Sequence, residues 1–462
     1  MSIPRSLVRD FRNVLGEDSV FTEDADLLSY AYDAAVLEQR KPAVVLAPSS
    51  RELLGRAVGM CYAGGLPITV RGSGTNLSGA TVPEPGDSAV ILTSKLNSIL
   101  EINTRDLYAV VEPGVVTARL AEAAAAQGLF YPPDPGSQEV STLGGNVALN
   151  AGGLRGLKYG VTKDYLMGME LFDCGGELVK TGSRTVKCVT GYNLAGLMLA
   201  SEGTLGVFSS IILKLLPPPR ASRAMLAVFD RFRDAARAVA EIVAARILPC
   251  TLEFMDTRCI RAVESFRHIG LPVDAGAILL IEVDGGSEEG VVSDAREVKA
   301  VCSACGASGV REASDPAEKA RIWEARRNAL PALARLRPTT VLEDATVPRS
   351  KVPDMVEAVA SLAAKHRLEV GVFGHAGDGN LHPTILCDRR DPEEFARVEA
   401  MVDGIFEAAL NLQGTLSGEH GIGLAKARWM EKETNRATVE FSKRIRKALD
   451  PKGLLNAGKK IV

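Results

Sequence analysis

The chain of 462 residues is too long for a single hydrophobic core, so we expect two or three domains. With 46% hydrophobic and 24% charged residues, its composition is that of a folded protein rather than a disordered one. Lysine and arginine number 54 against 57 aspartates and glutamates, and a net charge of −3 argues against nucleic acid as a partner.

The beginning of the chain lacks the features of an export signal. Asp10, Glu17 and Asp18 interrupt the apolar run that such a signal needs. No stretch of about 18 apolar residues occurs, so we expect no integral membrane segment. The eight scattered cysteines should then stay reduced, and the CxxC spacing of Cys302 and Cys305 has no second pair at zinc-site distance. We expect a cytoplasmic protein, with any membrane association peripheral at the inner membrane.

Alternating strands and helices are predicted for the first part of the chain. The strand PAVVLAP is followed by a helix that Ser49 or Ser50 can cap, and then by the strand LPITV. The same order recurs in SAVILTS, LYAVVEPG and a helix that Thr117 can cap. This order predicts α/β architecture. We end the first domain at residue 217, because helices and central strands do not continue through the three prolines at 217–219.

The remainder of the chain predicts a different domain. MLAVF, CTLEFMD and AILLIEVDG have the pattern of strands, and amphipathic helices separate them. This order indicates a largely antiparallel sheet, so the whole chain falls in the α+β class. We assign residues 218–425 to this second domain and residues 426–462, with a helix at 432–449, to a C-terminal segment.

Three glycine-rich loops predict a nucleotide site. The loop VRGSGTNLSGA, residues 70–80, follows a predicted strand, and its glycines can take the positive φ angles that turn N–H groups toward one anion. An ordinary turn is the alternative, but the length of the loop and its lack of acidic residues favour a pyrophosphate. The P-loop lysine and the GxGxxG spacing are both missing, which disfavours ATP and NAD. With STLGGNVALNAGG (141–153) and ASEGTLGV (200–207), three loops around one extended ligand favour FAD.

Three of the five histidines lie in two short glycine-bracketed motifs. VGVFGHAGDGNLHPTILC predicts a β-hairpin. If His375 pairs with His382, both imidazoles lie on one face, close enough to share a cation. The opposite, buried face then holds Val370, Val372, Ile385 and Cys387.

SGEHGIG adds Glu419 and His420 on a turn. Two histidines and a carboxylate are typical of a catalytic zinc, manganese or iron site with open positions. The alternative is that these histidines cap turns or donate to buried carbonyls.

Taken together, these motifs resemble the FAD-linked oxidases that share the vanillyl-alcohol-oxidase fold. Within that family the chain is similar to the group of the glycolate oxidase D-subunit, D-lactate dehydrogenase and D-2-hydroxyglutarate dehydrogenase. The resemblance runs from about residue 40 to the C-terminus, although Ala457 stands where a proline is common. The motifs that carry it are VRGSGTNLSGA, PPDPGS, STLGGN, ASEGTLGV, FGHAGDGNLHP, SGEHGIG and LNAGK.

The resemblance implies a two-domain α+β flavoprotein with a vanillyl-alcohol-oxidase-type FAD-binding domain and an antiparallel-sheet substrate domain. It implies that the first loop binds the pyrophosphate, that residues 142–146 lie along it, and that Asn456 returns to the flavin domain. The expected cofactor-binding residues are Arg71, Gly72, Ser73, Gly74, Thr75, Asn76, Ser78, Gly79, Pro132, Asp134, Gly136, Ser137, Thr142, Leu143, Gly144, Gly145, Asn146, Asn150, Gly152, Gly153, Glu202, Gly206, Val207 and Asn456.

The FAD should be held without a covalent bond. Several relatives attach it through a histidine in the first loop or a cysteine in the second glycine-rich region. This chain has no histidine before His268 and no cysteine between Cys61 and Cys174.

The resemblance also implies roles around the reacting atoms. His375, His382 and Glu419 match the metal ligands, with zinc favoured over manganese or iron, and His420 matches the catalytic base. Arg326 and Arg327 are neighbours on a predicted helix, so only one can face a pocket, and the resemblance selects Arg326 as the clamp for the substrate carboxylate. The other expected substrate contacts are Arg349, Asn380 and Thr384.

The implied activity is oxidation of a small D-2-hydroxy acid with hydride transfer to flavin N5. Leu330 and Leu342 stand where D-2-hydroxyglutarate enzymes use polar residues, so D-lactate or glycolate is favoured over that diacid. D-2-hydroxyglutarate dehydrogenase, a flavin-dependent transferase of the ether-lipid-synthase kind and an electron-transfer subunit with a vestigial site remain the alternatives. The chain has no iron–sulfur cysteine pattern, so electrons should leave to an iron–sulfur subunit, an electron-transfer flavoprotein, a quinone or oxygen, and we expect an oligomer or complex subunit.

Overall fold

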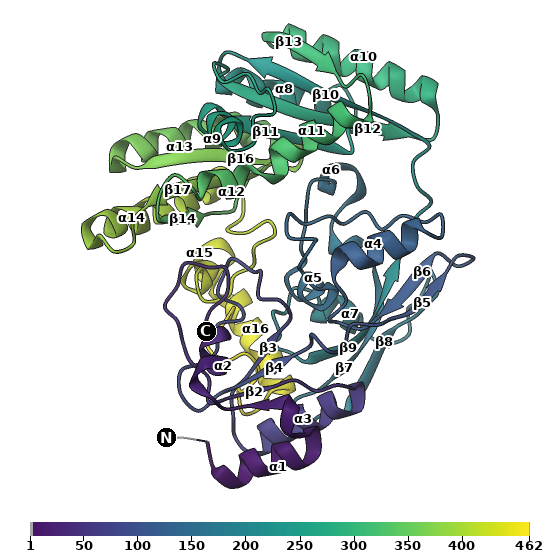
Figure 1. The fold of residues 1–462 in the computed structure, drawn as a ribbon, viewed down its shortest axis with the longest axis vertical. Helices are drawn as coiled ribbons and strands as arrows, with labels where there is room; N and C mark the ends of the chain where they lie inside the picture. Colours follow the sequence, from purple (N-terminus) through teal and green to yellow (C-terminus); the bar gives the residue numbers. More distant parts are fainter. Residues whose placement is uncertain (1–2, 462) are drawn as a thin grey trace. The chain divides into compact units, whose positions relative to one another are not determined.

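The computed structural model describes residues 3–461 (Figure 1). The chain forms two compact units. Unit 1 consists of Met1–Ala151, Val161–Pro218 and Glu419–Val462, and unit 2 consists of Gly152–Gly160 and Pro219–Gly418.

Unit 1 begins with a four-stranded sheet in the order β1-β2-β4-β3. Strands β2 and β3 both run parallel to β4, as the alternating pattern predicts. The connecting helix starts where expected, because the Ser50 side chain accepts a hydrogen bond from Leu53 N and so caps it. The bounds are β1 Val20–Phe21, β2 Val44–Leu46, α3 Arg51–Ala63, β3 Ile68–Arg71 and β4 Ala89–Leu92.

A second sheet of unit 1 has five antiparallel strands in the order β5-β6-β9-β7-β8. The prediction that Thr117 caps the helix after β6, which is α4 (Thr117–Ala125), is wrong. Val116 is the cap residue, and the Thr117 hydroxyl donates instead to the carbonyl oxygen of Ser141, 3.0 Å away. The strands are β5 Ile99–Asn103, β6 Tyr108–Val111, β7 Leu166–Phe172, β8 Leu178–Gly182 and β9 Val207–Lys214.

The C-terminal segment of unit 1 extends the edge of the first sheet. Ile68 N donates to the carbonyl of Leu454, and Asn456 N donates to the carbonyl of Ile68, each at 2.7 Å. The remaining helices and 3₁₀ turns of unit 1 are α1 Arg5–Leu15, η1 Glu17–Ser19, α2 Asp24–Ser29, α4 Thr117–Ala125, α5 Leu143–Leu149, η2 Thr162–Asp164, α7 Leu194–Met198, η5 Ala427–Trp429, α15 Met430–Glu433 and α16 Arg436–Leu449.

Unit 2 is built on an eight-stranded antiparallel sheet, as the sequence predicts. Seven of the strands follow the order β13-β10-β12-β11-β16-β17-β14, and β15 also pairs with β17. Their bounds are β10 Ala221–Phe229, β11 Thr251–Asp256, β12 Ala277–Gly285, β13 Ala307–Glu312, β14 Thr339–Leu342, β15 Ala345–Thr346, β16 Glu369–His375 and β17 Asn380–Cys387.

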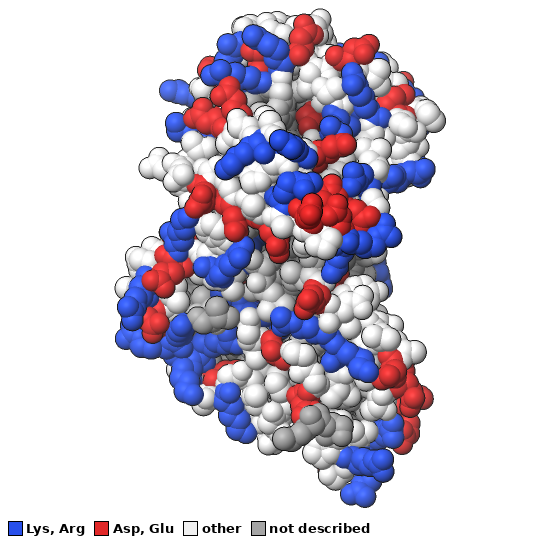
Figure 2. Space-filling view, turned by 90° about the vertical axis from the view of Figure 1, so that its left-hand side faces the viewer, with Lys and Arg blue, Asp and Glu red and all other residues white. Residues whose placement is uncertain are grey.

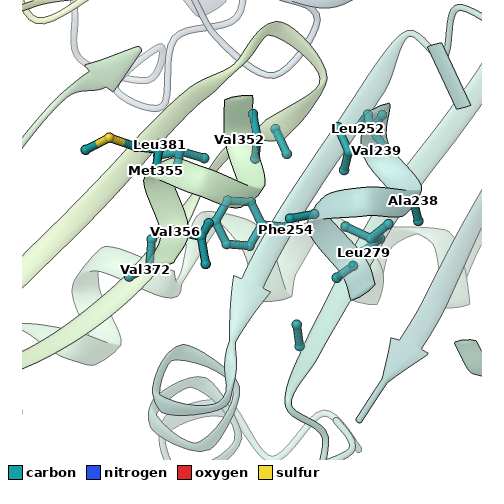
Figure 3. Close-up of a cluster of buried hydrophobic side chains, with 14 of the residues drawn as sticks. Ala238, Val239, Leu252, Phe254, Leu279, Val352, Met355, Val356, Val372 and Leu381 are labelled. Atoms are coloured by element: carbon teal, nitrogen blue, oxygen red, sulfur yellow. The ribbon is translucent and has the colours of Figure 1, made fainter. Parts of the chain in front are cut away.

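Helices cover both faces of this sheet (Figure 1). One core includes Phe254, which lies among the side chains of Val352, Val356 and Leu279 in Figure 3. Helices α8, α10, α13 and α14 contribute to this core, and α9, α11 and α12 contribute to the core on the opposite face. Their bounds are α8 Phe232–Ala244, α9 Thr257–Arg267, α10 Glu288–Ala304, α11 Pro316–Arg327, α12 Ala329–Leu333, η3 Arg349–Lys351, α13 Val352–His366, η4 Ala376–Asp378 and α14 Pro392–Asn411.

A short stretch from earlier in the chain also belongs to unit 2. Helix α6, Gly156–Tyr159, is fastened to β12 because Lys158 and Tyr159 both hydrogen-bond to the carboxylate of Asp284. The side chain of Leu157 packs against the core between the sheet and α8.

Charged side chains of both signs are interspersed over the face drawn in Figure 2, in keeping with the balanced composition. Within residues 3–461, none of the helices combines the length with the apolar character that crossing a bilayer requires.

Candidate functional site

A cavity with about 560 Å³ of empty space, part of it open to solvent, lies within unit 1. Glycines make up much of its wall, so backbone atoms can approach a ligand closely there. The lining residues are Val70, Gly72, Ala80, Thr81, Thr93, Pro113, Gly144, Gly145, Ala148, Leu149, Glu202, Gly203, Gly206, Val207 and Phe208. All three glycine-rich loops identified in the sequence therefore contribute to one cavity.

Contacts inside the first loop give it a fixed shape. The Asn76 side chain accepts from Ala80 N and donates to the Thr81 hydroxyl, both at 2.9 Å. A Cβ atom at Gly72 would collide with Oγ1 of Thr142, and one at Gly144 would meet Pro113. The loop and the start of α5 thus approach each other where only glycine fits, which suits the passage of an extended cofactor such as FAD.

The carboxylate of Glu202 fastens the segment that carries His420. It accepts from Ile422 N at 2.9 Å and Gly423 N at 2.7 Å, and it forms an ion pair with Lys460 at 3.1 Å. A Cβ at Gly421 would meet Leu149 and Glu202, which both line the cavity. His420, the neighbour of Gly421, is therefore held beside the cavity wall.

Asn456 joins three segments of unit 1 around the cavity. Its side-chain nitrogen donates to the carbonyl of Ala80 at 2.8 Å and to that of Glu202 at 2.5 Å. Its side-chain oxygen accepts from the Thr69 hydroxyl at 3.3 Å. The C-terminal motif thereby supports two of the lining residues.

Six of the expected cofactor residues line the cavity: Gly72, Gly144, Gly145, Glu202, Gly206 and Val207. Others have roles in the fold. Asn146 donates to the Thr117 hydroxyl at 2.7 Å, and Asn150 ends α5 with a φ of 54°. The guanidinium of Arg71 donates to the carbonyl of Tyr32. Sequence reasoning missed the lining residues Thr93 and Pro113, because neither belongs to a glycine cluster.

The histidine motif forms the expected hairpin, but in a different register. His375 pairs with Asn380, and Phe373 rather than His375 pairs with His382, so the predicted pairing of the two histidines is wrong. The register is shifted because the turn between the strands is short. It consists only of η4 and Gly379, whose positive φ of 83° reverses the chain in time for Asn380 to pair with His375. Residues 380 and 382 share a face, so both imidazoles still lie together, with ring centroids 5.1 Å apart at 90°.

The opposite face of the hairpin is buried, as predicted. Val372, Ile385 and Cys387 belong to the core shown in Figure 3, and Val370 packs against it.

A buried glutamate on β11 joins the two groups that the sequence assigns to metal and substrate. Phe254 pairs with Gly374, so the next antiparallel step places Glu253 opposite His375. The Glu253 side chain is 0% exposed. One of its oxygens lies 2.7 Å from Nδ1 of His375, and the other accepts from Nε of Arg326. Burial raises the pKa of Glu253, but the charges of His375 and Arg326 outweigh it, so the net shift is downward.

Arg326 lies on the inward face of α11, whereas Arg327 is exposed. The guanidinium carbon of Arg326 lies 4.8 Å from the ring centre of Phe373. The ring of Phe373 is in turn 5.5 Å from the ring of His382. The hydrogen bond to Glu253 uses Nε, so the two Nη groups can serve an anion.

Other predicted residues surround this cluster at different depths. Thr384 is fully buried and donates to the carbonyl of His382 at 3.3 Å, and Asn380 is buried beside His375. Arg349 is exposed in η3. Glu419 and His420 belong to unit 1 and follow Gly418, the last residue of unit 2, directly in the chain.

Sequence reasoning missed two buried acids, Glu253 and Asp344. Asp344 offers a ligand atom within 4.8 Å of one from His382, and it accepts a hydrogen bond from the Ser417 hydroxyl at 2.8 Å. A charged residue between the apolar residues Leu252 and Phe254 was the available signal for Glu253, although that signal does not reveal its partners.

Comparisons with known proteins find the family that the sequence motifs resemble. The model of the FAD binding domain matches residues 42–182, and that of the C-terminal domain of FAD linked oxidases matches residues 218–460. The glycolate oxidase subunit GlcD of Bacillus subtilis is 44% identical, covering 99% of this chain and 97% of its own length. The D-lactate dehydrogenase of Anaerostipes hadrus is 33% identical, covering 92% and 91%.

Among solved structures, p-cresol methylhydroxylase shares the fold with a TM-score of 0.80 at 17% identity, covering 99% of this chain and 96% of that chain. The family models and the two relatives agree over nearly the whole length of the chain. The chain therefore belongs to the FAD-linked oxidase family.

Proposed function

We propose that this flavoprotein oxidises a small D-2-hydroxy acid, D-lactate or glycolate, to the 2-oxo acid. The relatives named for glycolate and D-lactate support this substrate class. The observation that carries the proposal is the grouping of His375, His382 and Arg326 in unit 2. The carboxylate of Glu253 contacts both His375 and Arg326, and the ring of His382 lies 5.1 Å from that of His375. We take residues 1–217 and 426–462 as the FAD-binding domain and 218–425 as the substrate domain, except that residues 152–160 belong to unit 2 and residues 419–425 to unit 1.

The donor set suits a divalent cation, with zinc favoured over manganese or iron. Two imidazoles lie 5.1 Å apart, and Glu419 follows directly after unit 2 as the third ligand. Because Glu253 contacts Nδ1 of His375, we assign Nε2 of that ring to the metal, as in other carboxylate–histidine–metal arrangements. A cation held by these residues would lower the pKa of the substrate hydroxyl.

The chain's own groups supply binding and proton transfer. The Nη groups of Arg326 bind the substrate carboxylate, and Asn380, Thr384 and Arg349 complete the substrate contacts. His420 accepts the hydroxyl proton, and Glu202 holds the backbone that follows it. FAD, when bound, supplies the hydride acceptor.

The size of the substrate follows from two apolar side chains. Leu330 and Leu342 pack against the core between the sheet and α9. They offer no charge or hydrogen bond to a second carboxylate, so D-2-hydroxyglutarate should be a poor substrate.

Electrons should then pass to a partner, an iron–sulfur subunit or an electron-transfer flavoprotein, or to a quinone. The word subunit in the name of the Bacillus subtilis relative supports membership of a complex. A cytoplasmic location with peripheral attachment at the inner membrane would fit such a partner.

Anaerobic titration of the purified protein tests the proposal. D-lactate, L-lactate, glycolate and D-2-hydroxyglutarate are added separately, with and without a chelator, while flavin absorbance is followed. We expect bleaching by D-lactate or glycolate that the chelator suppresses. If D-lactate and L-lactate bleach the flavin equally and the chelator has no effect, the mechanism is contradicted. If none of the acids bleaches the flavin, a transferase of the ether-lipid-synthase kind is favoured.

A further inference from the structure

We propose that Glu253 is a positioning residue that couples the metal to the substrate anion, because its carboxylate orients both His375 and Arg326. The inference rests on the proposed function, which gives those two residues their roles. Glu253 itself touches neither the reacting atoms nor the cofactor in this scheme.

The geometry of Glu253 fits a shared support. Strand β11 lies between β12 and β16, so Glu253 stands in the interior of the sheet and is 0% exposed. Each carboxylate oxygen has its own partner, His375 Nδ1 at 2.7 Å and Arg326 Nε. A single rigid group therefore sets the ring plane of a metal ligand and the direction of the anion clamp.

A carboxylate can do this where an amide cannot. Ionised Glu253 accepts at both oxygens, whereas glutamine offers one acceptor and one donor. If the amide oxygen accepts from Arg326, its NH₂ group faces Nδ1 of His375 and favours the ring tautomer with the proton on Nε2. That proton occupies the nitrogen assigned to the metal. If the amide is reversed, two donors face each other at Arg326.

A purely structural role for Glu253 would be to hold α11 against the sheet, and Glu282 provides the matched control. It lies on the neighbouring strand β12 and accepts from Nε1 of Trp323 at 2.9 Å and Nζ of Lys319 at 2.6 Å, both on α11. Glu282→Gln therefore weakens the attachment of the same helix without touching either histidine.

The test compares FAD-loaded wild type, Glu253→Gln and Glu282→Gln, all full length. Zinc affinity is measured by competition with a chromophoric chelator. The binding of oxalate, an unreactive dianion, is measured from the flavin spectrum with and without zinc. We expect Glu253→Gln to lose about 10–100-fold in zinc affinity while keeping its FAD. Zinc should strengthen oxalate binding by wild type and by Glu282→Gln, but much less by Glu253→Gln.

The outcomes separate the two proposals. Wild type that binds no zinc overturns both. Wild type that binds zinc while Glu253→Gln binds it equally well overturns only the role of Glu253, as does an equal loss in Glu282→Gln. If Glu253→Gln does not fold, Glu253→Asp takes its place. That variant keeps the charge on a shorter side chain, and we expect a smaller but measurable loss of zinc affinity, with wild-type affinity overturning the inference.

Discussion

Asn456 donates its side-chain amide to the backbone carbonyl of Glu202, 254 positions earlier in the chain. The same nitrogen donates to Ala80, so one side chain near the C-terminus supports two residues of the cavity wall. The groups involved are buried, and their hydrogen bonds cannot be replaced by water without a change in structure.

Asn456→Ala should therefore weaken FAD binding at least tenfold and lower the free energy of unfolding by about 1–3 kcal/mol. Fluorescence titration of the apoprotein with FAD and denaturant unfolding measure the two effects. Asn97→Ala is the control, because Asn97 is exposed and its side chain donates only locally, to the Ser94 carbonyl. Equal FAD affinity in the Asn456 variant and wild type would contradict a role at the cavity.

Gly72→Ala should abolish or strongly reduce flavin loading, since its new methyl group would collide with Oγ1 of Thr142. The double variant Gly72→Ala/Thr142→Ala removes that oxygen and should recover part of the FAD content. Gly286→Ala, at a glycine with open space around it, should load normally. The absorbance ratio of flavin to protein in the purified samples gives the answer, and full loading of the single variant would refute the close approach.

His420→Ala should keep its FAD and lose reductive bleaching by the hydroxy acid, by about 10²–10⁴-fold in rate. Stopped-flow absorbance under anaerobic conditions measures this rate. His268→Asn, a change at an exposed histidine at the end of α9, should bleach like wild type. Loss of FAD from His420→Ala would show instead that His420 serves cofactor binding.

Denaturation should release the flavin completely. The first loop carries no histidine and the second glycine-rich region no cysteine, so neither position can form a covalent bond to the ring. After precipitation with acid, all yellow colour should be in the supernatant and the pellet should be colourless. A flavin-coloured pellet after washing would mean a covalent link elsewhere in the chain.

Lys459 should make stability rise with pH in the alkaline range. Burial, only partly offset by Glu84, lowers the pKa of Lys459 from its ordinary 10.5 to about 8. In the native state Lys459 then releases its proton at a lower pH than in the unfolded state. Below pH 8 the buried side chain is charged, and its desolvation lowers the free energy of unfolding by the full amount. That cost disappears between pH 8 and 10.5 and is worth at most about 3–4 kcal/mol.

Lys459→Met removes this dependence. Urea unfolding at several pH values should show the variant more stable than wild type near pH 7, with the difference shrinking toward pH 10. A difference that stays constant with pH would assign the effect to packing rather than to charge.

Periodicity and glycine spacing predicted much of the hairpin but not its register. The apolar residues Val372 and Ile385 correctly gave the buried face. The pairing of His375 with Asn380 depends on how tightly η4 and Gly379 turn, and several turn lengths fit the sequence AGDGN. The two histidines still lie on the same face of the sheet, because the predicted and observed registers differ by two residues and such a shift moves no side chain to the other face.

The contacts of Glu253 with His375 and Arg326 could not be predicted from the sequence. Glu253 alternates with Leu252 and Phe254, a pattern typical of a strand with one face in water. That face is covered by α9 and α11, and only long-range packing brings Arg326 to the carboxylate. Likewise, Glu202 was predicted from its glycine-rich motif, but its bonds to Ile422 and Gly423 join residues more than two hundred positions apart.

Unit 1 is assembled from three separate stretches of polypeptide. A fragment that ends at Pro218 would lack the strand-like extension at Leu455 that hydrogen-bonds to Ile68, as well as the backbone amides that neutralise Glu202. Expressed alone, such a fragment should be an incomplete domain, exposing an open sheet edge to aggregation.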